Sequence, residues 1–363
     1  MDLLPNITNV SFRMATDEDK HLPTYDNTKL MNINTCPTWG IIRYSKHLKM
    51  PGSQRAMPLE AGAAAHEGFA AMRWMHLMLK HTDDKVGKMI AENAGVNIFG
   101  GERFGKMLDT INGGASDRTN CINFVLEGLY TSGFYDDPSD RNRTVSNISE
   151  SLIAYIDRYD MDRYPLWIRD VTDPNSDVGI EIAFDIVVTF SVENEEYECD
   201  TDIHEYRFTG KLDGLHWNRD KLCIIEEKTA GNIGDAWLAQ WVMANQITGY
   251  CVAAATFTGE PCMDAIVSGT KLPLPKVVSE GIRKEVVTRN ELMFRNWAHW
   301  FYTTVQLERA YIDNVVKAPK YTHSCSRYFR ACSFIPFCAS ESEEDQLGIL
   351  DEMQLDEWSP LDE

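Results

Sequence analysis

The chain has 363 residues, of which 44% are hydrophobic and 25% charged, and its formal net charge is −20 at pH 7. No apolar run is long enough to span a bilayer, and the first residues lack the basic start and apolar core of a signal peptide, which argues against a membrane protein and against export. We therefore expect a cytoplasmic protein, whose nine cysteines are thiols or metal ligands rather than disulfides. The length suits one elaborated domain or two smaller ones.

The first half of the chain is expected to be mainly helical. Residues 1–34 are polar and predict a partly irregular segment. The expected helices cover residues 57–79, which are rich in Ala, Leu and Met, pieces of 82–134 between breaks at Gly100-Gly101 and Gly113-Gly114, and residues 148–159. Together they predict a helical insertion at about residues 80–165.

The second half of the chain predicts a sheet. Residues 180–190 alternate, with Glu181, Ala183 and Asp185 facing opposite to three apolar residues, as in a half-buried strand. The remaining expected elements are strands at 208–217, 222–228 and 265–267, a helix at 235–257, and a strand followed by a long helix within 280–311. This order predicts an α/β fold, in which a mixed central sheet is flanked by helices within a helical surround.

The hairpin predicted around the turn Asn218-Arg219-Asp220 carries Asp213, Glu226 and Lys228. Side chains alternate along a strand, so Glu226 and Lys228 share one face while Glu227 points to the other. An acidic pair on neighbouring strands is costly without a cation, and Mg²⁺ and Mn²⁺ bind carboxylate oxygens. The alternative is a surface hairpin with scattered charges, in which Lys228 is only the ion-pair partner of Glu226.

Gln246 and Tyr250 follow the hairpin on the predicted helix 235–257. They are four residues apart and therefore lie on one face of that helix. One interpretation is ordinary core packing, in which Tyr250 packs with Trp237 and Trp241.

Two further residues are candidates for the same site. His66 ends the small-residue run Ala61–Ala65 of the predicted helix 57–79, and its imidazole suits Mn²⁺ better than Mg²⁺. A lone histidine on such a helix is more often a satisfied core residue. Glu181, on the strand before the hairpin, is a further candidate for a metal ligand or a base.

Four cysteines are set apart from the rest by their positions. Cys325, Cys332 and Cys338 lie close together near one end of the chain, and Cys36 lies near the other. Four thiolates suit a [4Fe–4S] cluster or Zn²⁺, and ligands from both ends would staple the fold. The other five cysteines, which are Cys121, Cys199, Cys223, Cys251 and Cys262, are expected to be buried thiols.

These four motifs, taken in their order from Thr35 to Cys338, resemble the PD-(D/E)XK nuclease superfamily. The resemblance is to RecB-type iron–sulfur exonucleases of the CRISPR-associated and phage kind, although the gap between Cys325 and Cys332 is longer than expected there. It implies a restriction-endonuclease-like nuclease domain over residues 35–338. It also implies that Asp213, Glu226 and Lys228 are catalytic and that Gln246 and Tyr250 contact DNA. The implied ligands of Mg²⁺ or Mn²⁺ are His66, Asp213, Glu226 and the backbone carbonyl of Glu227, with Glu181 as a further candidate. The implied ligands of a [4Fe–4S] cluster, with Zn²⁺ as the alternative, are Cys36, Cys325, Cys332 and Cys338.

The resemblance implies a metal-dependent DNA exonuclease of recombination, repair or phage DNA processing, acting on DNA with single-stranded ends in the cytoplasm of a bacterium or a phage-infected host. The sequence contains no G-x-x-x-x-G-K-[ST] motif, so a helicase motor would be a separate protein. Two alternatives remain open. One is a structure-selective or restriction-type endonuclease, and the other is a non-catalytic DNA-binding or scaffold protein with a structural metal.

The end of the chain is strongly acidic. Ten acidic residues and no basic residue lie between Glu341 and Glu363, so residues 339–363 predict a solvated, disordered tail. The alternative is a helix, built around Leu347, Leu350 and Trp358, that binds a helicase, a recombinase or a single-strand-binding protein. The negative charge argues against tight DNA binding by charge alone, but it does not exclude a local basic groove.

Overall fold

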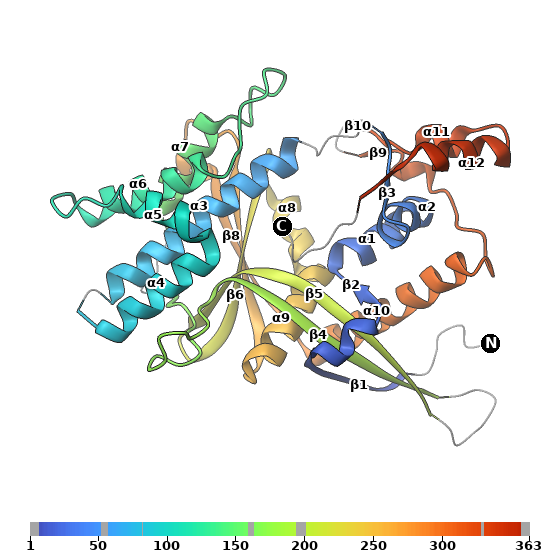
Figure 1. Ribbon diagram of the computed structural model, residues 1–363, viewed down its shortest axis with the longest axis horizontal. Coiled ribbons are helices and arrows are strands. Elements are labelled where there is room, and N and C mark those ends of the chain that lie inside the picture. Colours follow the sequence, from blue (N-terminus) through green and yellow to red (C-terminus); the bar gives the residue numbers. More distant parts are fainter. Residues whose placement is uncertain are drawn as a thin grey trace. The chain divides into compact units, whose positions relative to one another are not determined.

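The computed structural model describes residues 7–51, 57–81, 83–158, 163–193, 201–327 and 330–356. Helices and a mainly antiparallel sheet make up this part of the chain, so the expected mixed α/β class is confirmed. The chain forms two compact units (Figure 1). The first comprises Met1–Gln54, Phe184–Gly210 and Glu291–Glu363, and the second comprises Arg55–Ala183 and Lys211–Asn290.

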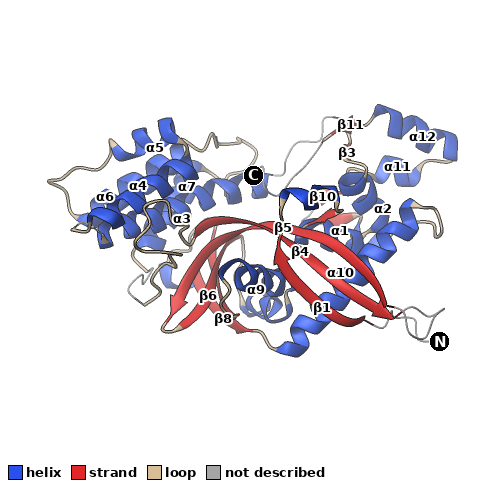
Figure 2. Cartoon of the chain, turned by 60° about the horizontal axis from the view of Figure 1, so that its bottom comes forward, coloured by secondary structure: helices blue, strands red, loops and turns tan. Residues whose placement is uncertain are grey.

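The sheet has the hydrogen-bonded order β1-β4-β5-β6-β7-β8, with β2 beside β5. Its strands are β1 (Ile7–Met14), β2 (Thr24–Tyr25), β4 (Ile180–Glu193), β5 (Thr201–Asn218), β6 (Lys221–Ala230), β7 (Cys262–Lys271) and β8 (Ile282–Thr288), of which β4 and β5 contribute residues to both units. The pair β6–β7 is parallel, because helix α9 (Asn245–Thr258) crosses over between these two strands. Figure 2 shows α9 beside β6 and β8, and β7 is longer than the expected 265–267.

The helices of the second unit agree with the expected segments. Before the hairpin they are α3 (Met57–Lys80), α4 (Lys85–Phe99), α5 (Gly101–Leu108), α6 (Asp117–Tyr130) and α7 (Val145–Ile156). Gly100, with a φ of 76°, adopts a backbone conformation that favours glycine and separates α4 from α5, as the glycine pair predicts. No described helix is long and apolar enough to cross a membrane.

These helices share an aromatic core around Trp74 of α3. The Trp74 ring is fully buried and stacks on Phe124 at a centroid distance of 4.6 Å, while Phe104 meets it edge to face. Its indole Nε1 donates a hydrogen bond to the carbonyl oxygen of Ala91, so the only polar atom of the ring is satisfied. This packing holds α3 in place along its length, and α3 carries His66.

The helix expected at 235–257 is interrupted. It consists of α8 (Asp235–Ala239), the 3-10 helix η3 (Gln240–Met243) and α9, and Ala244 between them has an extended backbone with a ψ of 119°. The buried guanidinium of Arg289 donates hydrogen bonds to the carbonyl oxygens of Trp241, Val242 and Ala244, at 2.8 to 3.2 Å. The carbonyls of Trp241 and Ala244 also accept local backbone hydrogen bonds, and Arg289 adds a tertiary contact that stabilises the break.

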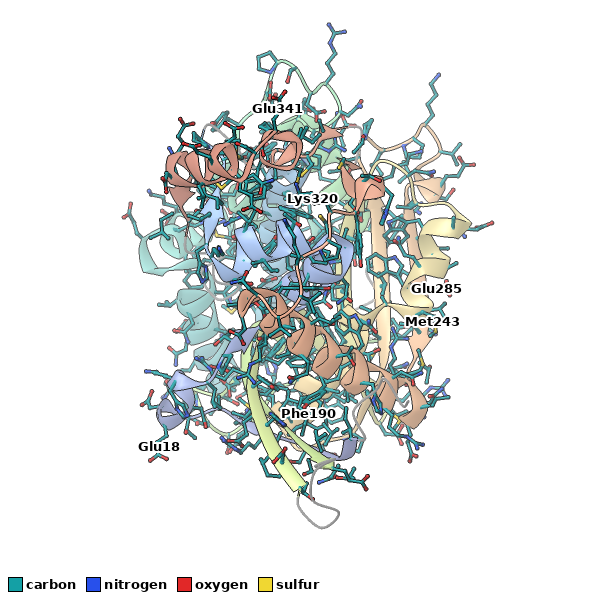
Figure 3. The ribbon with its side chains drawn as sticks, turned by 90° about the vertical axis from the view of Figure 1, so that its right-hand side faces the viewer. Glu18, Phe190, Met243, Glu285, Lys320 and Glu341 are labelled. Carbon is teal, nitrogen blue, oxygen red and sulfur yellow. The ribbon has the colours of Figure 1, made fainter. Side chains whose placement is uncertain are left out.

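The first unit packs around the long helix α10 (Glu291–Ile312). Phe301 of α10 is fully buried among Phe190, Tyr206, Phe208 and Trp297, and Figure 3 labels Phe190. The other elements of this unit are η1 (Asp17–His21), α1 (Asn27–Thr35), α2 (Pro37–Gly40), the π-helix η2 (Ile41–Ser45), β3 (Leu48–Lys49), η5 (Thr322–Ser324), β9 (Ser326–Arg327), β10 (Arg330–Ala331), α11 (Ile335–Ala339), α12 (Glu343–Glu352) and β11 (Gln354–Leu355).

The N-terminal segment is more regular than its polar composition predicts. Within the described part of residues 1–34, β1 pairs with β4 along its length, and α1 begins at Asp26, whose carboxylate accepts hydrogen bonds from two backbone N–H groups. The segment expected to be partly irregular therefore contains a regular strand. Its polar composition did not reveal β1, because β1 is an edge strand, in which mostly exposed polar residues are compatible with pairing.

The acidic tail is also partly ordered, which corrects the expectation of disorder for its described residues. Helix α12 begins after Ser342, whose side chain caps it, and Leu355 of β11 pairs with Leu48 of β3. Met353 is buried in a small apolar cluster with Phe334 and Phe337. Ile349 and Leu350 pack against the same cluster, while Leu347 and Leu355 stay exposed. Residues 357–363, including Trp358, lie outside the described residues.

Candidate functional site

The hairpin of β5 and β6 brings two carboxylates together. The paired part of the hairpin ends at Gly214 with Ile225, and Asp213 and Glu226 are the next residues on the two strands. Both residues are buried, with exposed fractions of 8% for Asp213 and 1% for Glu226. Two buried carboxylates repel each other and lose their hydration, so this arrangement requires positive charge nearby.

A histidine from α3 and a glutamate from β4 complete an acidic cluster with Asp213. One potential ligand atom from each of His66, Glu181 and Asp213 lies within 4.8 Å of the other two. His66 Nδ1 is 3.1 Å from Asp213 Oδ1, and Glu181 Oε2 is 3.1 Å from the Nζ of Lys211. The structure thus brings His66 and Glu181, which sequence reasoning treated as separate candidates, to the same carboxylate.

Glu181 has an unusual backbone as well. Its φ is 49°, in the left-handed region that residues with a β-carbon rarely adopt. Such conformations cost about 1–3 kcal/mol and occur most often at functional sites. The side chain of Glu181 lies in the acidic cluster, so the strained backbone coincides with the candidate site.

Glu226 is held by a lysine of its own strand and by a glutamine of α9. The Nζ of Lys228 lies 2.5 Å from Glu226 Oε1, and Nε2 of Gln246 donates a hydrogen bond to the same oxygen at 3.2 Å. Gln246 Nε2 also donates to the hydroxyl oxygen of Tyr250 at 3.0 Å. The Gln-x-x-x-Tyr pair of α9 and the Glu-x-Lys strand therefore form one hydrogen-bonded group, which simple core packing does not require.

The charges in the cluster shift one another's proton affinities. Burial first, and then the Asp213 carboxylate, raise the pKa of Glu226 to about 8 and that of Glu181 to about 7. Burial alone would lower the pKa of His66, but Asp213 raises it to about 9. Burial opposes ionisation of Asp213, yet His66 holds the pKa of this carboxyl well below its usual range. Near neutral pH the cluster therefore retains protons that a bound cation would displace.

The side chain of Glu227 points to the opposite face of β6. It forms an ion pair with the guanidinium of Arg73 from α3, and the hydroxyl of Tyr155 from α7 donates a hydrogen bond to its Oε1 at 3.0 Å. All three side chains are almost completely buried. The backbone N–H of Glu227 donates to Asp213 Oδ2 at 2.8 Å, so this residue also orients the acidic cluster.

Arg73 and Tyr155 are the residues that sequence reasoning missed. Arg73 lies seven residues, or two turns, after His66 on α3, so both face the same side of the helix. That spacing was the signal available, since a charged residue on an apolar helix face needs a buried partner. The ion pair of Arg73 with Glu227 fixes α3 against β6 and with it the position of His66.

The donor set fits a divalent cation. Glu181 Oε1 and Glu226 Oε2 are buried and have no hydrogen-bond partner among the described residues. Mg²⁺ and Mn²⁺ bind carboxylate oxygens, and an imidazole among the ligands favours Mn²⁺. A cation would satisfy these oxygens and offset the repulsion between the carboxylates.

The four singled-out cysteines are neighbours in the first unit. Burial raises the pKa of Cys332, and Cys36 and Cys325 raise it further; burial also raises the pKa of Cys338, where the other three thiols add to the effect and Lys320 opposes it. The backbone N–H of Cys332 donates to the carbonyl oxygen of Cys325 at 2.8 Å. Cys36 and the three cysteines of residues 325–338 are thus close enough to affect one another's pKa.

The remaining cysteines are free thiols where the structure describes them. Cys121, Cys223, Cys251 and Cys262 are buried and belong to the second unit, as expected, and Cys199 lies outside the described residues. Burial raises the pKa of the Cys223 thiol to about 12, so this thiol keeps its proton. The four described thiols therefore behave as core residues.

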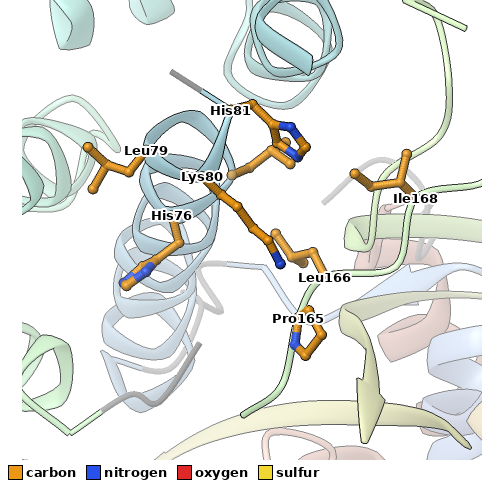
Figure 4. A pocket seen from close by; sticks show the side chains of 8 residues that line it. His76, Leu79, Lys80, His81, Pro165, Leu166 and Ile168 are labelled. Carbon is orange, nitrogen blue, oxygen red and sulfur yellow. The ribbon is translucent and has the colours of Figure 1, made fainter. Parts of the chain in front are cut away.

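A separate cavity of about 260 Å³ lies at the C-terminal end of α3 (Figure 4). Its lining residues are His76, Leu77, Leu79, Lys80, His81, Pro165, Leu166 and Ile168, and Lys80 points toward Leu166 and Pro165. Lys80 comes fourteen residues after His66, which corresponds to roughly 21 Å along the helix. The cavity is therefore distinct from the acidic cluster and contains none of its carboxylates.

Comparison with known proteins adds little to this geometry. The sequence matches no profile of a known protein family, and it matches no curated protein. A solved structure titled "Crystal structure of SSO0001" is similar over 43% of this chain, at 17% sequence identity and a TM-score of 0.24. The match spans 56% of that chain, and so low a TM-score does not establish a common fold.

Proposed function

We propose that this chain is a metal-dependent deoxyribonuclease of the PD-(D/E)XK type, acting as an exonuclease. The observation that carries the proposal is the convergence of His66, Glu181 and Asp213 within 4.8 Å, beside the buried pair of Glu226 and Lys228. Carboxylates, an imidazole and a lysine in this arrangement suit phosphodiester hydrolysis, in which charge develops on a phosphate.

The residues have distinct roles in this proposal. Mg²⁺ or Mn²⁺ would be held by His66, Asp213, Glu226 and the backbone carbonyl of Glu227, with Glu181 as a further ligand, and would supply positive charge to the scissile phosphate and to a water nucleophile. Lys228, whose ammonium lies beside Glu226, donates hydrogen bonds to a phosphate oxygen or orients the nucleophile. Gln246 orients the Glu226 carboxylate, and Tyr250 holds Gln246 in place.

The finer fold assignment belongs to the same proposal. A restriction-endonuclease-like core is supported by the antiparallel pair β5–β6 that carries Asp213 and Glu226, followed by the crossover helix α9 and the parallel strand β7. The neighbouring Cys36, Cys325, Cys332 and Cys338 would bind a [4Fe–4S] cluster, and Zn²⁺ is the alternative. This cluster would be structural, since ligands from both ends of the chain would be joined.

The test is digestion of end-labelled linear DNA by protein purified without oxygen, with Mg²⁺, with Mn²⁺ and with neither. We expect metal-dependent release of label from the ends, and no nicking of a covalently closed circle. Nicking of the circle would identify an endonuclease instead. DNA binding without cleavage under any metal condition would favour a non-catalytic scaffold and contradict the proposal.

A further inference from the structure

Two tryptophans flank Lys228 on the face of β6 that carries the candidate catalytic groups. Gly269 of β7 is the register partner of Lys228, so both positions face the same side of the sheet. A β-carbon on Gly269 would lie only 2.4 Å from Cη2 of Trp237, so the close approach of this ring requires glycine. The ring centroid of Trp241 is 5.9 Å from Lys228 Nζ. Both rings are half-buried.

The geometry of the pair leaves aromatic surface available. The two rings meet at a centroid distance of 5.4 Å and an interplanar angle of 71°, an edge-to-face contact. In such a contact the ring that presents its edge keeps both of its faces uncovered by its partner. Trp241 Nε1 is also buried without a hydrogen-bond partner among the described residues, although buried indole N–H groups usually have one. An oxygen of a bound molecule could accept it.

The segment that carries both rings is fixed at its two ends by arginines from β8 and the residue that follows it. Arg283 forms an ion pair with Asp235 at 2.9 Å, and Arg289 binds the carbonyl oxygens at the end of η3. Figure 3 shows η3 near β8 at Met243 and Glu285. Because the segment is already ordered, a ligand that stacks on these rings would lose little affinity to their ordering.

We propose that Trp237 and Trp241 form a stacking platform for an unpaired base next to the scissile phosphate, so that the strand to be cut enters the site unpaired. This inference rests on the proposed nuclease function. Every base has a π-face, so stacking tolerates any sequence, as a nuclease without sequence preference requires. Bases inside a duplex stack on each other and cannot use such a platform. Lys228, which contacts Trp241, then places the adjacent phosphate beside Glu226.

The experiment measures kcat/KM of the full chain on a single-stranded oligodeoxynucleotide and on its duplex, for the wild type, Trp237→Ala, Trp241→Ala and Trp241→Phe. Stacking of one base contributes ~1–3 kcal/mol, so each alanine variant should lose about 5- to 150-fold on the single strand, and Trp241→Phe much less. Trp217→Ala is the matched control, because this half-exposed tryptophan pairs with Leu222, roughly 20 Å along β6 from Lys228.

A second readout separates stacking from loss of structure. A single abasic site, moved along the oligonucleotide, should reduce cleavage by the wild type at one position near the cut and should cause no additional loss in Trp241→Ala. If both alanine variants cleave the single strand as the wild type does, or if the abasic position affects them and the wild type equally, the platform is wrong.

A binding measurement tests the platform without requiring cleavage. Quenching of tryptophan fluorescence by the single-stranded oligonucleotide should occur in the wild type and in Trp217→Ala, and should be largely lost in Trp237→Phe/Trp241→Phe. If the quenching depends on the two tryptophans but the wild type cleaves no DNA, the platform is supported and the nuclease function is contradicted. Cleavage by the wild type with unchanged quenching in the double variant would overturn only the platform.

Discussion

The acidic cluster of the second unit and the four cysteines of the first are assembled in different ways. The acidic cluster takes Asp213 and Glu226 from adjacent strands of one hairpin and adds His66 from α3 and Glu181 from β4. The cysteines come from a loop between α1 and α2 and from the region around α11, near the two ends of the chain. The hairpin pair is local, whereas the cysteine group depends on closing almost the whole chain.

The two regions also differ in what a missing metal costs. In the acidic cluster, buried carboxylates repel each other, and orphaned oxygens of Glu181 and Glu226 are left without a partner in the described residues. The thiols are neutral when protonated, and burial raises the pKa of Cys332 and Cys338. We therefore expect that metal at the acidic cluster controls chemistry, while metal at the cysteines controls stability.

The largest expected effect is loss of cleavage on changing the acidic cluster. Asp213→Ala, Glu226→Ala and Lys228→Ala should each lower kcat by at least ~10²–10³-fold, because each removes a group that acts on charge at one phosphate. Titration calorimetry should show weaker Mn²⁺ binding in the two carboxylate variants but not in Lys228→Ala. Asp220→Ala, at the exposed turn of the same hairpin, is the control. Near-normal cleavage by any two of the three variants would contradict the assignment.

The second prediction concerns the buried ion pair beneath the cluster. Removing one partner by Arg73→Met should leave Glu227 unpaired and cost about 3–5 kcal/mol of unfolding free energy, measured by urea denaturation. The partly exposed ion pair of Arg103 with Glu67 provides the comparison. Arg103→Met should lower the free energy of unfolding far less, because solvent screens the charges of an exposed ion pair. The double variant Arg73→Met/Glu227→Leu should recover part of the loss. Equal costs for the two arginines would mean that the buried pair does not hold α3.

The cysteine region is tested by Cys36→Ser. Protein purified without oxygen should be brown and contain iron and sulfide, and the variant should lose iron, thermal stability and activity together, because one ligand set joins both ends of the chain. Cys262→Ser, which changes a buried thiol of the second unit, should leave the iron content unchanged. Colourless wild-type protein with one zinc would refute the cluster, and a stable, active Cys36→Ser variant would remove Cys36 from the ligand set.

The dependence of metal binding on pH should follow the shifted proton affinities. Folding raises the pKa of both carboxyls above the ordinary glutamate value of 4.5. Their contribution to the stability of the metal-free protein is therefore complete at a pH below 4.5. It is lost as the pH rises through about 7 for Glu181 and about 8 for Glu226. A cation must displace those protons, so the rise in melting temperature caused by Mn²⁺ should be larger at pH 8.5 than at pH 6. A pH-independent rise would mean that neither carboxylate is a ligand.

The smallest expected effects belong to α9. Gln246→Ala and Tyr250→Ala should lower activity by about 5- to 10-fold, on the scale of one neutral hydrogen bond of roughly 1 kcal/mol, without weakening Mn²⁺ binding as Asp213→Ala does. The reason is that Gln246 reaches the carboxylates through Glu226 Oε1, the oxygen that Lys228 also holds. Thr256→Ala, on the far part of the same helix, is the control. Loss of metal affinity equal to that of Asp213→Ala would show that α9 supports the ligands themselves.

Local patterns in the sequence were sufficient for the fold class, for most of the helices and for the two faces of β6. Periodicity and alternation are properties of neighbouring residues, so the opposite directions of Glu226 and Glu227 follow from the strand alone. Glycine pairs likewise marked the end of α4, because only glycine adopts the backbone of Gly100 easily.

Only the tertiary structure decided the rest. The partners of Glu227, which are Arg73 and Tyr155, come from distant helices, and the break at Ala244 depends on Arg289. The order of residues 339–356 depends on burying Met353, which composition does not reveal. Long-range contacts and burial set these features and the shifted pKa values of Glu181 and Glu226, and no short stretch of sequence contains that information.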